Sequence, residues 1–261
     1  MKVLSSPRFR RLATLCGSVL VAVLVAVAVS CVEQGKDAGQ PQAGTGSPDK
    51  VSVPAGDVSA LLAKLTVAKE ASMTGYSREK FPHWDTNKAE HGFGDQFTQY
   101  AKCTTREVMM LRDATGAVTL DAKTCELKVG SGGGWRDEYG VLDRKAGSLK
   151  EYKFITDPSA VDAEHIVALA EAWRSGADKK DEATRRRIAN DAINLEASDP
   201  TANRSKGDQD AANYLPPGKF RCAYIYRYLQ IKVKYELTVD SAEQTALRTA
   251  VDACTREGGF G

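Results

Sequence analysis

A carboxylate–histidine pair marks the part of this 261-residue chain best equipped for chemistry. The pair opens the run EHIVALAEAW, and two asparagines follow downstream, the second of them inside NRSKGD. A carboxylate and an amide oxygen are hard ligands suited to a magnesium-like cation. A histidine beside such a cation can take a proton from water near neutral pH, and basic side chains attract a phosphodiester. The residues of this pattern are Glu164, His165, Asn194, Asn203, Arg204 and Lys206.

Residues 162–217 resemble the HNH (ββα-metal) endonucleases, which are named for this His…Asn…Asn/His series. Within that group, the segment is most similar to the HNH family related to the C-terminal domain of the GmrSD restriction enzymes, which includes many secreted proteins. A lone EH or NRSK would recur by chance. The whole series in one order is specific.

The resemblance implies a role for each residue. His165 would deprotonate the water that attacks phosphorus, and Asn194 would brace the loop that carries this histidine. Glu164 and Asn203 would be the metal ligands, with Mg²⁺ as the expected ion and Mn²⁺ as an alternative. The family more often has Asp before the histidine, so Asp162 is a substitute or additional ligand.

Arg204 and Lys206 adjoin the expected metal ligand Asn203, and we interpret them as nucleic-acid contacts. Other basic residues, among them Arg174 and the triplet at 185–187, are better explained as solvated surface charges. The expected substrate is DNA, and RNA stays an alternative. A second alternative is a catalytically inactive cell-surface binding protein that retains the HNH scaffold. No protein partner is evident from the sequence.

The first residues of the chain combine positive charge with an apolar stretch. Four basic residues precede residues 12–29, which are apolar, as in an export signal. The sequence AVSC resembles a bacterial lipobox, which predicts that Cys31 is lipidated. Cleavage with simple secretion, or retention of 12–29 as a membrane anchor, are the alternatives, since roughly 18 apolar residues can span a bilayer. We expect residues 1–31 to direct export and to supply any contact with a membrane.

The rest of the chain divides by composition. Residues 32–52 are rich in Gly, Gln, Pro and Asp and predict a flexible linker. Residues 53–261 then have a length suited to one domain, by a prior of roughly 100–200 residues. The expected class is α+β: an HNH core at about 160–217, preceded by a small antiparallel sheet and helix region and followed by C-terminal helices.

Net charge excludes one kind of nucleic-acid binder. The chain has 36 basic and 34 acidic residues, a net charge of +2. Without the four basic residues of the export signal, 32 basic residues face 34 acidic ones, a net charge of −2. A tight nonspecific DNA binder is strongly basic. Contact with nucleic acid must therefore come from a local basic patch.

Four cysteines remain outside the export signal, and an even number in an exported chain predicts disulfides. They allow three connectivities, among which the sequence does not choose. We favour Cys103–Cys125 and Cys222–Cys254 because each closes a local loop. Metal ligation is the competing use of these cysteines, but the chain has no CxxC pair.

Periodicity predicts the elements around the motif. Helices are expected at 57–70, 169–174, 181–190, 220–235 and 241–254, with a short helix starting near 203 that closes the HNH core. A small antiparallel sheet is expected within 106–129, where VMML, AVTL and CELKV read as strands. Further strands are expected at 152–155, 165–168 and 193–197.

Acidic and histidine side chains also occur upstream of the motif. His83, Asp85, His91 and Asp95 could suggest a second metal site, but their spacing fits no known ligand pattern. Arg106 and Trp135 could line a substrate groove. For all of these we prefer packing of the N-terminal part against the nuclease core.

Overall fold

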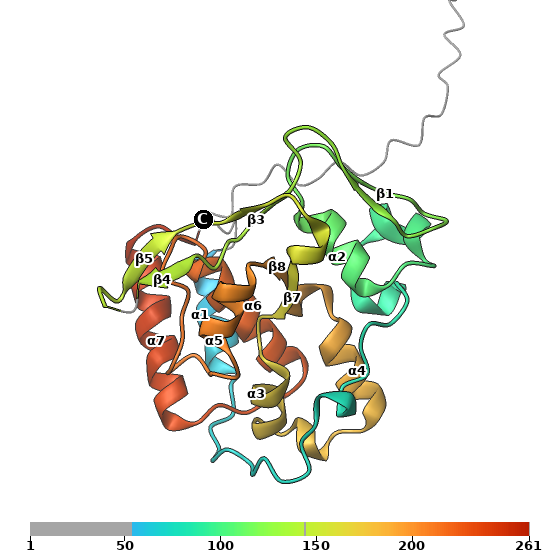
Figure 1. The fold of residues 1–261 in the computed structure, drawn as a ribbon. Coiled ribbons are helices and arrows are strands. Elements are labelled where there is room, and N and C mark those ends of the chain that lie inside the picture. The colour runs from blue at the N-terminus through green and yellow to red at the C-terminus, as the bar shows by residue number, and fades with distance from the viewer. Residues whose placement is uncertain (1–53, 144, 261) are drawn as a thin grey trace, which may run out of the picture. The chain divides into compact units, whose positions relative to one another are not determined.

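The computed structural model, which describes residues 54–143 and 145–260, combines helices with small sheets (Figure 1). The four sheets of the described residues are two-stranded and antiparallel. The class is mixed α and β, with helices at the C-terminal end, as predicted. The predicted export signal with Cys31, and the predicted linker at 32–52, lie outside the described residues. Among the described residues, no helix combines the length and apolarity needed to cross a membrane.

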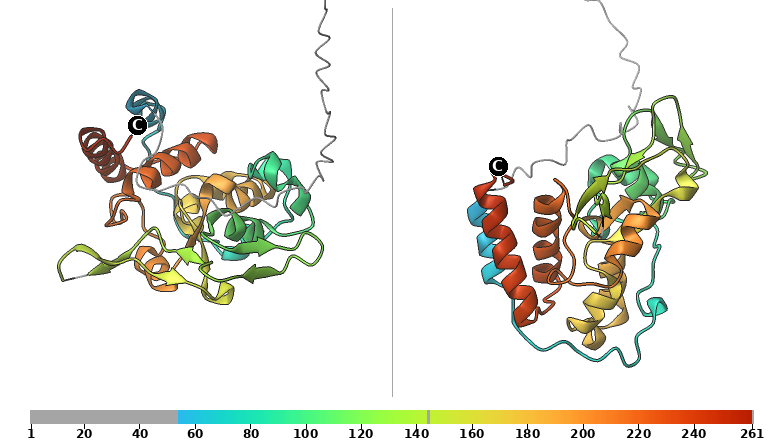
Figure 2. Two further views of the ribbon diagram at one scale, coloured as in Figure 1. Left: turned by 90° about the horizontal axis from the view of Figure 1, so that it is seen from above. Right: turned by 60° about the vertical axis from the view of Figure 1, so that its left-hand side comes forward.

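Three helices pack against one another although they come from the two ends of the described chain. They are α1 (Ala55–Ala63), α6 (Arg221–Lys234) and α7 (Ser241–Arg256), which lie side by side in Figure 2. The α6 and α7 predictions are confirmed to within two residues. The predicted helix at 57–70 is too long: α1 ends at Ala63, and Val67 instead forms a parallel bridge to Val239.

The segment VMML is helical, which corrects the strand predicted there. It lies in α2 (Thr105–Asp113), which a capping box begins: Glu107 accepts hydrogen bonds from the backbone N–H and the hydroxyl of Thr104. Met, Leu, Glu and Arg are good helix formers, and the cap supplies the start. The other two expected strands of this region are confirmed as β1 (Val118–Leu120) and β2 (Leu127–Val129), which pair with each other.

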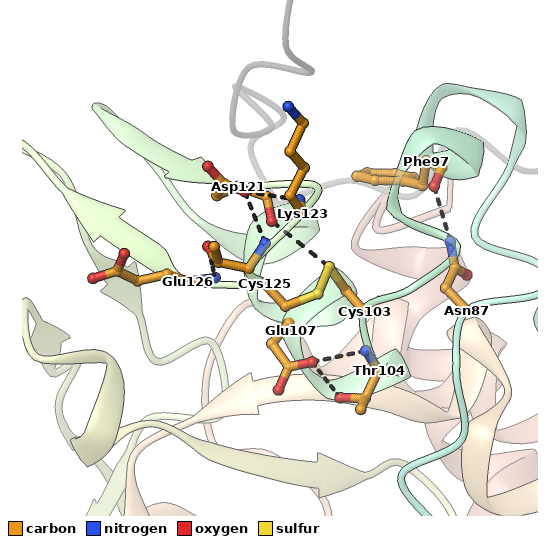
Figure 3. Close-up of a disulfide and its surroundings, with 10 residues drawn as sticks. Asn87, Phe97, Cys103, Thr104, Glu107, Asp121, Lys123, Cys125 and Glu126 are labelled. Carbon is orange, nitrogen blue, oxygen red and sulfur yellow. Dashed lines mark hydrogen bonds between the residues drawn. A yellow bond between two sulfur atoms is a disulfide. The ribbon is translucent and has the colours of Figure 1, made fainter.

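Both favoured disulfides are present. Cys103–Cys125 joins the residue before the α2 cap to the turn between β1 and β2 (Figure 3). Cys222–Cys254 joins the first turn of α6 to the last turns of α7. Each bridge therefore closes a local loop in a different part of the fold.

Two more hairpin-like pairs lead to the central region. β3 (Trp135–Arg136) pairs with β6 (Phe154–Ile155), and between them β4 (Val141–Asp143) pairs with β5 (Ser148–Glu151). The strand predicted at 152–155 is thus shorter than expected. Short 3₁₀ helices connect many elements: Arg78–Lys80, Ala89–His91, Asp95–Tyr100, Pro158–Ala160, Ala177–Lys179 and Ala192–Asn194.

The central region is a strand pair with helices on its connections. β7 (Asp162–His165) pairs antiparallel with β8 (Leu195–Ser198), so that Glu164 faces Glu196. The long connection contains α3 (Leu169–Arg174) and α4 (Glu182–Asn190), both confirmed as predicted, and α5 (Pro200–Lys206) follows β8 directly.

Apolar side chains form two clusters on either side of β7 and β8. The first contains Ile166 and Val167, which follow β7, together with buried residues of α3, α6 and α7. The second contains Leu195 and Ala197 of β8 together with buried residues of α2 and β1. Burial of apolar area is the main favourable term in folding. The second cluster therefore packs on the strand pair itself, and the first holds the chain that follows β7.

One group of buried charges ties three helices together. Lys232 of α6 is fully buried, and its ammonium lies 2.7 Å from Glu171 of α3 and 3.1 Å from Glu243 of α7. Ser175 accepts a further hydrogen bond from the same ammonium, and the Tyr228 hydroxyl donates to Glu243. Buried charges are tolerated only when paired in this way.

Candidate active site

His165 ends β7 and is buried, with 3% of its surface exposed. Its Nε2 lies 3.0 Å from the carbonyl oxygen of Ala189, the penultimate residue of α4. A carbonyl can only accept, so Nε2 must carry the proton, and Nδ1 of the neutral ring is left as an acceptor. Burial lowers the pKa of His165 to about 3. At neutral pH the ring is thus uncharged, and Nδ1 is its acceptor atom.

The boundaries of β7 and β8 both differ from the strands predicted at 165–168 and 193–197. β7 ends at His165 instead of beginning there, and β8 begins at Leu195, one residue after Asn194. Asn194 closes a 3₁₀ turn that Asp191 caps by accepting from the Ile193 N–H. The turn capped by Asp191 thus ends the connection between β7 and β8, and β8 starts directly after it.

The side chain of Asn194 is fully buried and bonded only to backbone. Its Oδ1 accepts from the N–H of Val167 at 2.8 Å, and its Nδ2 donates to the carbonyl of Ile188 at 2.9 Å. These two bonds connect the chain just after His165 to the end of α4, whose Ala189 carbonyl holds the imidazole. The contacts are those that a brace for the histidine requires.

Glu164 precedes the histidine and is paired with a buried lysine. The Lys206 ammonium, on a side chain with no exposed surface, lies 2.6 Å from Oε1 of Glu164. Burial raises the pKa of the Glu164 carboxyl, and Lys206 partly offsets this. The structure therefore places Lys206 in the interior, against the carboxylate, and not on a surface that nucleic acid can reach. Arg204, by contrast, is exposed on α5.

Asn203 lies on α5, and its orientation is set by a carboxylate. Its Nδ2 donates to Oδ2 of Asp162 at 3.0 Å, so its Oδ1 is the atom left for another partner. Asp162 of β7 is thus in contact with Asn203 of α5, the metal ligand proposed from the sequence. In this structure Asp162 positions Asn203.

The helix that carries Asn203 is anchored by a second buried carboxylate, which sequence reasoning missed. Asp199 caps α5 by accepting from the N–H groups of Thr201 and Ala202. The N–H of Asp199 itself donates to Oδ1 of Asp137, which is fully buried, at 3.1 Å. Burial raises the pKa of Asp137 to about 6. The sequence WRDEYG gave no signal for this contact across 62 positions.

Glu164, His165 and Asn203 line one cavity of about 120 Å³. Tyr76 and Arg78, from a loop far upstream, complete its wall. The volume is several times that of one water molecule, roughly 30 Å³. A carboxylate, an amide oxygen and an uncharged histidine around such a space fit a hydrated divalent cation. The donor set therefore fits the metal that the sequence pattern predicted, with Lys206 as a competing partner for Glu164.

Arg78 and Trp84 were missed by the sequence analysis because neither lies near the motif in the chain. Arg78 is exposed at the cavity, and its Nε lies 3.4 Å from Nε2 of His83. Trp84 stacks on His165, with ring centroids 5.8 Å apart and an angle of 8° between the planes. The loop that contains Arg78 and Trp84 thus places one guanidinium at the cavity and one aromatic ring against His165.

Arg106 and Trp135 pack in the interior, as we preferred. The Arg106 guanidinium donates to the carbonyl of Val161, and the buried Trp135 indole donates to the carbonyl of Met110. Arg174 pairs with Glu171 and Glu70. None of these three lines the cavity between β7 and α5.

Two comparisons with known proteins found a match. The family model described as GmrSD restriction endonucleases, C-terminal domain, matches residues 104–250, more than half of the chain. An uncharacterized secreted protein of the fungus Arthroderma benhamiae is 34% identical over 197 residues, covering 74% of this chain and 83% of the relative. No solved structure matches. The matched region contains one cysteine of each disulfide, Cys125 and Cys222, and every residue that lines the cavity except Tyr76 and Arg78.

Proposed function

This chain belongs to the GmrSD restriction endonuclease C-terminal domain family, and we propose that it is an exported, metal-dependent HNH endonuclease that hydrolyses phosphodiester bonds of DNA. The family supports a nuclease-like function, and the secreted relative and the two disulfides are consistent with export. The observation that carries the proposal is the convergence of Glu164, His165 and Asn203 on one cavity.

The order of the central elements supports the HNH assignment. β7, β8 and α5 follow the ββα series, with the histidine at the end of the first strand and Asn203 on the helix. We place the HNH core at about 160–217 within a single nuclease domain of residues 53–261. Residues 1–31 would be the export signal, and 32–52 the linker.

His165 is the proposed general base. Its neutral ring presents Nδ1 as an acceptor because Nε2–H is held by the Ala189 carbonyl. A water held near Nδ1 would lose its proton to the imidazole as its oxygen attacks phosphorus. Trp84 covers one face of the ring and Asn194 fixes its loop, so the imidazole is positioned before substrate arrives.

Glu164 and the Oδ1 atom of Asn203 would hold the cation, which we expect to be Mg²⁺, with Mn²⁺ as a substitute. Restriction-endonuclease-like domains generally use divalent metals, and when bound the ion supplies Lewis-acid stabilisation of charge on the phosphate and the leaving oxygen. Lys206 would hold Glu164 ionised and in place. Arg78 at the cavity and Arg204 on the exposed face of α5 would contact the phosphates.

The test is nicking of supercoiled plasmid by the oxidised protein in Mg²⁺, in Mn²⁺ and in EDTA, with His165→Ala in parallel. We expect metal-dependent nicking that falls at least about 10²-fold in the variant, the low end of general-base contributions. Added imidazole should restore part of the lost activity, because the base alone is missing. An RNA substrate in the same assay distinguishes DNA from RNA cleavage.

Two results would oppose the proposal. Equal nicking by a still-folded His165→Ala protein would remove the histidine from the mechanism. Absence of cleavage with every metal would favour the alternative of a binding protein on the same scaffold, for which the Lys206–Glu164 pair would serve as a permanent neutral core.

A further inference from the structure

A second cluster of potential metal ligands lies upstream of the nuclease motif. The carboxylates of Asp85 and Glu90 and a ring nitrogen of His91 all lie within 4.8 Å of one another. None of the three lines the cavity that contains His165. The sequence alone did not favour this cluster, because the acidic residues and the histidine follow no recognised ligand spacing.

His91 is the observation that separates this cluster from an ordinary group of surface charges. The side chain is 1% exposed, yet neither ring nitrogen makes a hydrogen bond to the described residues. Its Nε2 points at the cluster, 3.3 Å from Oδ2 of Asp85, without hydrogen-bonding geometry. Buried polar atoms are nearly always satisfied, so an orphaned imidazole beside two carboxylates needs a partner.

A positive charge already lies in the cluster. The Lys88 ammonium is 3.1 Å from Oδ2 of Asp85 and 4.0 Å from Oε1 of Glu90. The Lys88 side chain is half exposed and can turn into solvent. It does not contact His91 in any recorded hydrogen bond or ion pair of the described residues. A cation bound by both carboxylates and the imidazole would replace this ammonium and satisfy the histidine as well.

The backbone around the cluster is fixed before any ion binds. The Asn87 N–H donates to the carbonyl of Cys103, and its side chain donates to the carbonyl of Phe97 at 2.9 Å (Figure 3). The carbonyl of Asp85 accepts from the Thr105 N–H. The part of the loop that carries Asp85 is therefore tied to residues 103–105, beside the Cys103–Cys125 disulfide.

We propose that Asp85, Glu90 and His91 bind a divalent transition-metal ion of the Zn²⁺ type, which fixes the loop that covers the active site. An imidazole with two carboxylates suits Zn²⁺ better than Mg²⁺ or Ca²⁺, which take oxygen ligands. Trp84, which stacks on His165, is the residue before Asp85. The N–H of Asp85 donates to Asn190 at the end of α4. An ion here would hold both contacts.

The proposal does not depend on the nuclease function, and its test is metal binding. The full mature chain carrying Glu164→Gln, which removes a ligand of the proposed catalytic ion, is titrated with ZnCl₂ by calorimetry, and bound metal is counted after dialysis. One equivalent of Zn²⁺ is expected. His91→Gln in the same background should weaken binding at least about tenfold, while His83→Gln, a matched change in the same loop, should leave it unchanged.

A second variant, Lys88→Ala, distinguishes loss of a metal ligand from loss of folding. It removes an exposed competitor, so Zn²⁺ should bind roughly two- to fivefold more tightly, a gain that damaged protein would not give. The proposal is overturned if the parent binds no Zn²⁺, if His91→Gln binds as well as the parent, or if Lys88→Ala binds more weakly. Failure of plasmid cleavage alone leaves it standing.

Discussion

At the scale of single residues, the site depends on side chains whose bonds leave one atom free to react. The Ala189 carbonyl fixes the proton of His165 on Nε2, and Asp162 fixes the amide of Asn203 so that Oδ1 is left over. Both arrangements follow from donor–acceptor rules. In the proposed mechanism, the atoms that face water and metal are therefore selected by the Ala189 carbonyl and by Asp162, neither of which is assigned a contact with substrate.

Arg78 should carry much of the phosphate binding. Arg78→Ala is expected to lower kcat/KM about 10- to 100-fold, since hydrogen bonds to charged groups contribute about 1.5–3 kcal/mol. Arg78→Lys should recover only part of this, because the ammonium lacks the planar fork. Arg248→Ala, an exposed arginine on α7, is the control and should have no effect. Kinetics on a short duplex measure all three, and an unchanged Arg78→Ala would contradict the assignment.

Asn194 should matter for stability as well as activity. Asn194→Ala leaves the Val167 N–H and the Ile188 carbonyl unpaired in the interior. We expect a loss of about 3 kcal/mol in the free energy of unfolding, from about 1–3 kcal/mol per unsatisfied group. Urea unfolding measures this. Asp252→Ala, at an exposed position of α7, should change the value by less than about 0.5 kcal/mol.

At the scale of elements, buried charges link helices and make their packing depend on pH. Glu243 of α7 faces Lys232 and Tyr228 of α6 and lies near Glu171 of α3. Burial is the largest cause that raises the pKa of Glu243, to about 7. The folded state therefore binds this proton more tightly than the unfolded state does.

The sign of the effect follows from that difference. The contribution of Glu243 is fully present below its unfolded pKa, near 4.5, and is lost as the pH rises through about 7. The glutamine of Glu243→Gln does not titrate, so this variant lacks the pH-dependent contribution. The free energy of unfolding of the wild type, relative to that of the variant, should therefore fall between pH 5 and 7.5 by up to about 3 kcal/mol. Thermal unfolding of both proteins across this range is the measurement. Parallel curves would show that Glu243 does not titrate there.

Helices and strands could be predicted from the sequence where the spacing of apolar residues and the capping residues indicated the same element. α3, α4, α6 and α7 followed from apolar spacing, and the β7–β8 pair followed from the motif, with boundaries shifted by up to three residues. α2 was taken for a strand because VMML is apolar throughout, and only its capping box distinguishes a helix there. Arg78, Trp84 and Asp137 could not be found, since long-range contacts place them and no local spacing records such contacts.

At the scale of the whole molecule, each apolar cluster has its own disulfide. Cys103 lies in the cluster of α2 and β8, and Cys222 and Cys254 lie in the cluster of α6 and α7. The pairing could be favoured from sequence because both loops are short, with separations of 22 and 32 residues. β7 and β8 connect the two clusters.

Loss of either bridge should cost about 3–4 kcal/mol by the chain-entropy estimate for loops of this size. Because the bridges lie in different clusters, the two losses should add in a protein that lacks both. Paired Cys→Ser variants of each bridge and of both, unfolded in urea, test this. If the protein without both bridges loses much less stability than the sum of the two single losses, the effects of the two bridges are not independent.

The contact between Lys206 and Glu164 has one more consequence. The site carries its own counter-ion, so the buried carboxylate is neutralised in the folded chain without help from solvent. The proposed cation should therefore be removable and replaceable while the chain stays folded. In the proposed exported nuclease, cleavage would then follow the supply of cation in the surroundings, while the fold would persist when the cation is scarce.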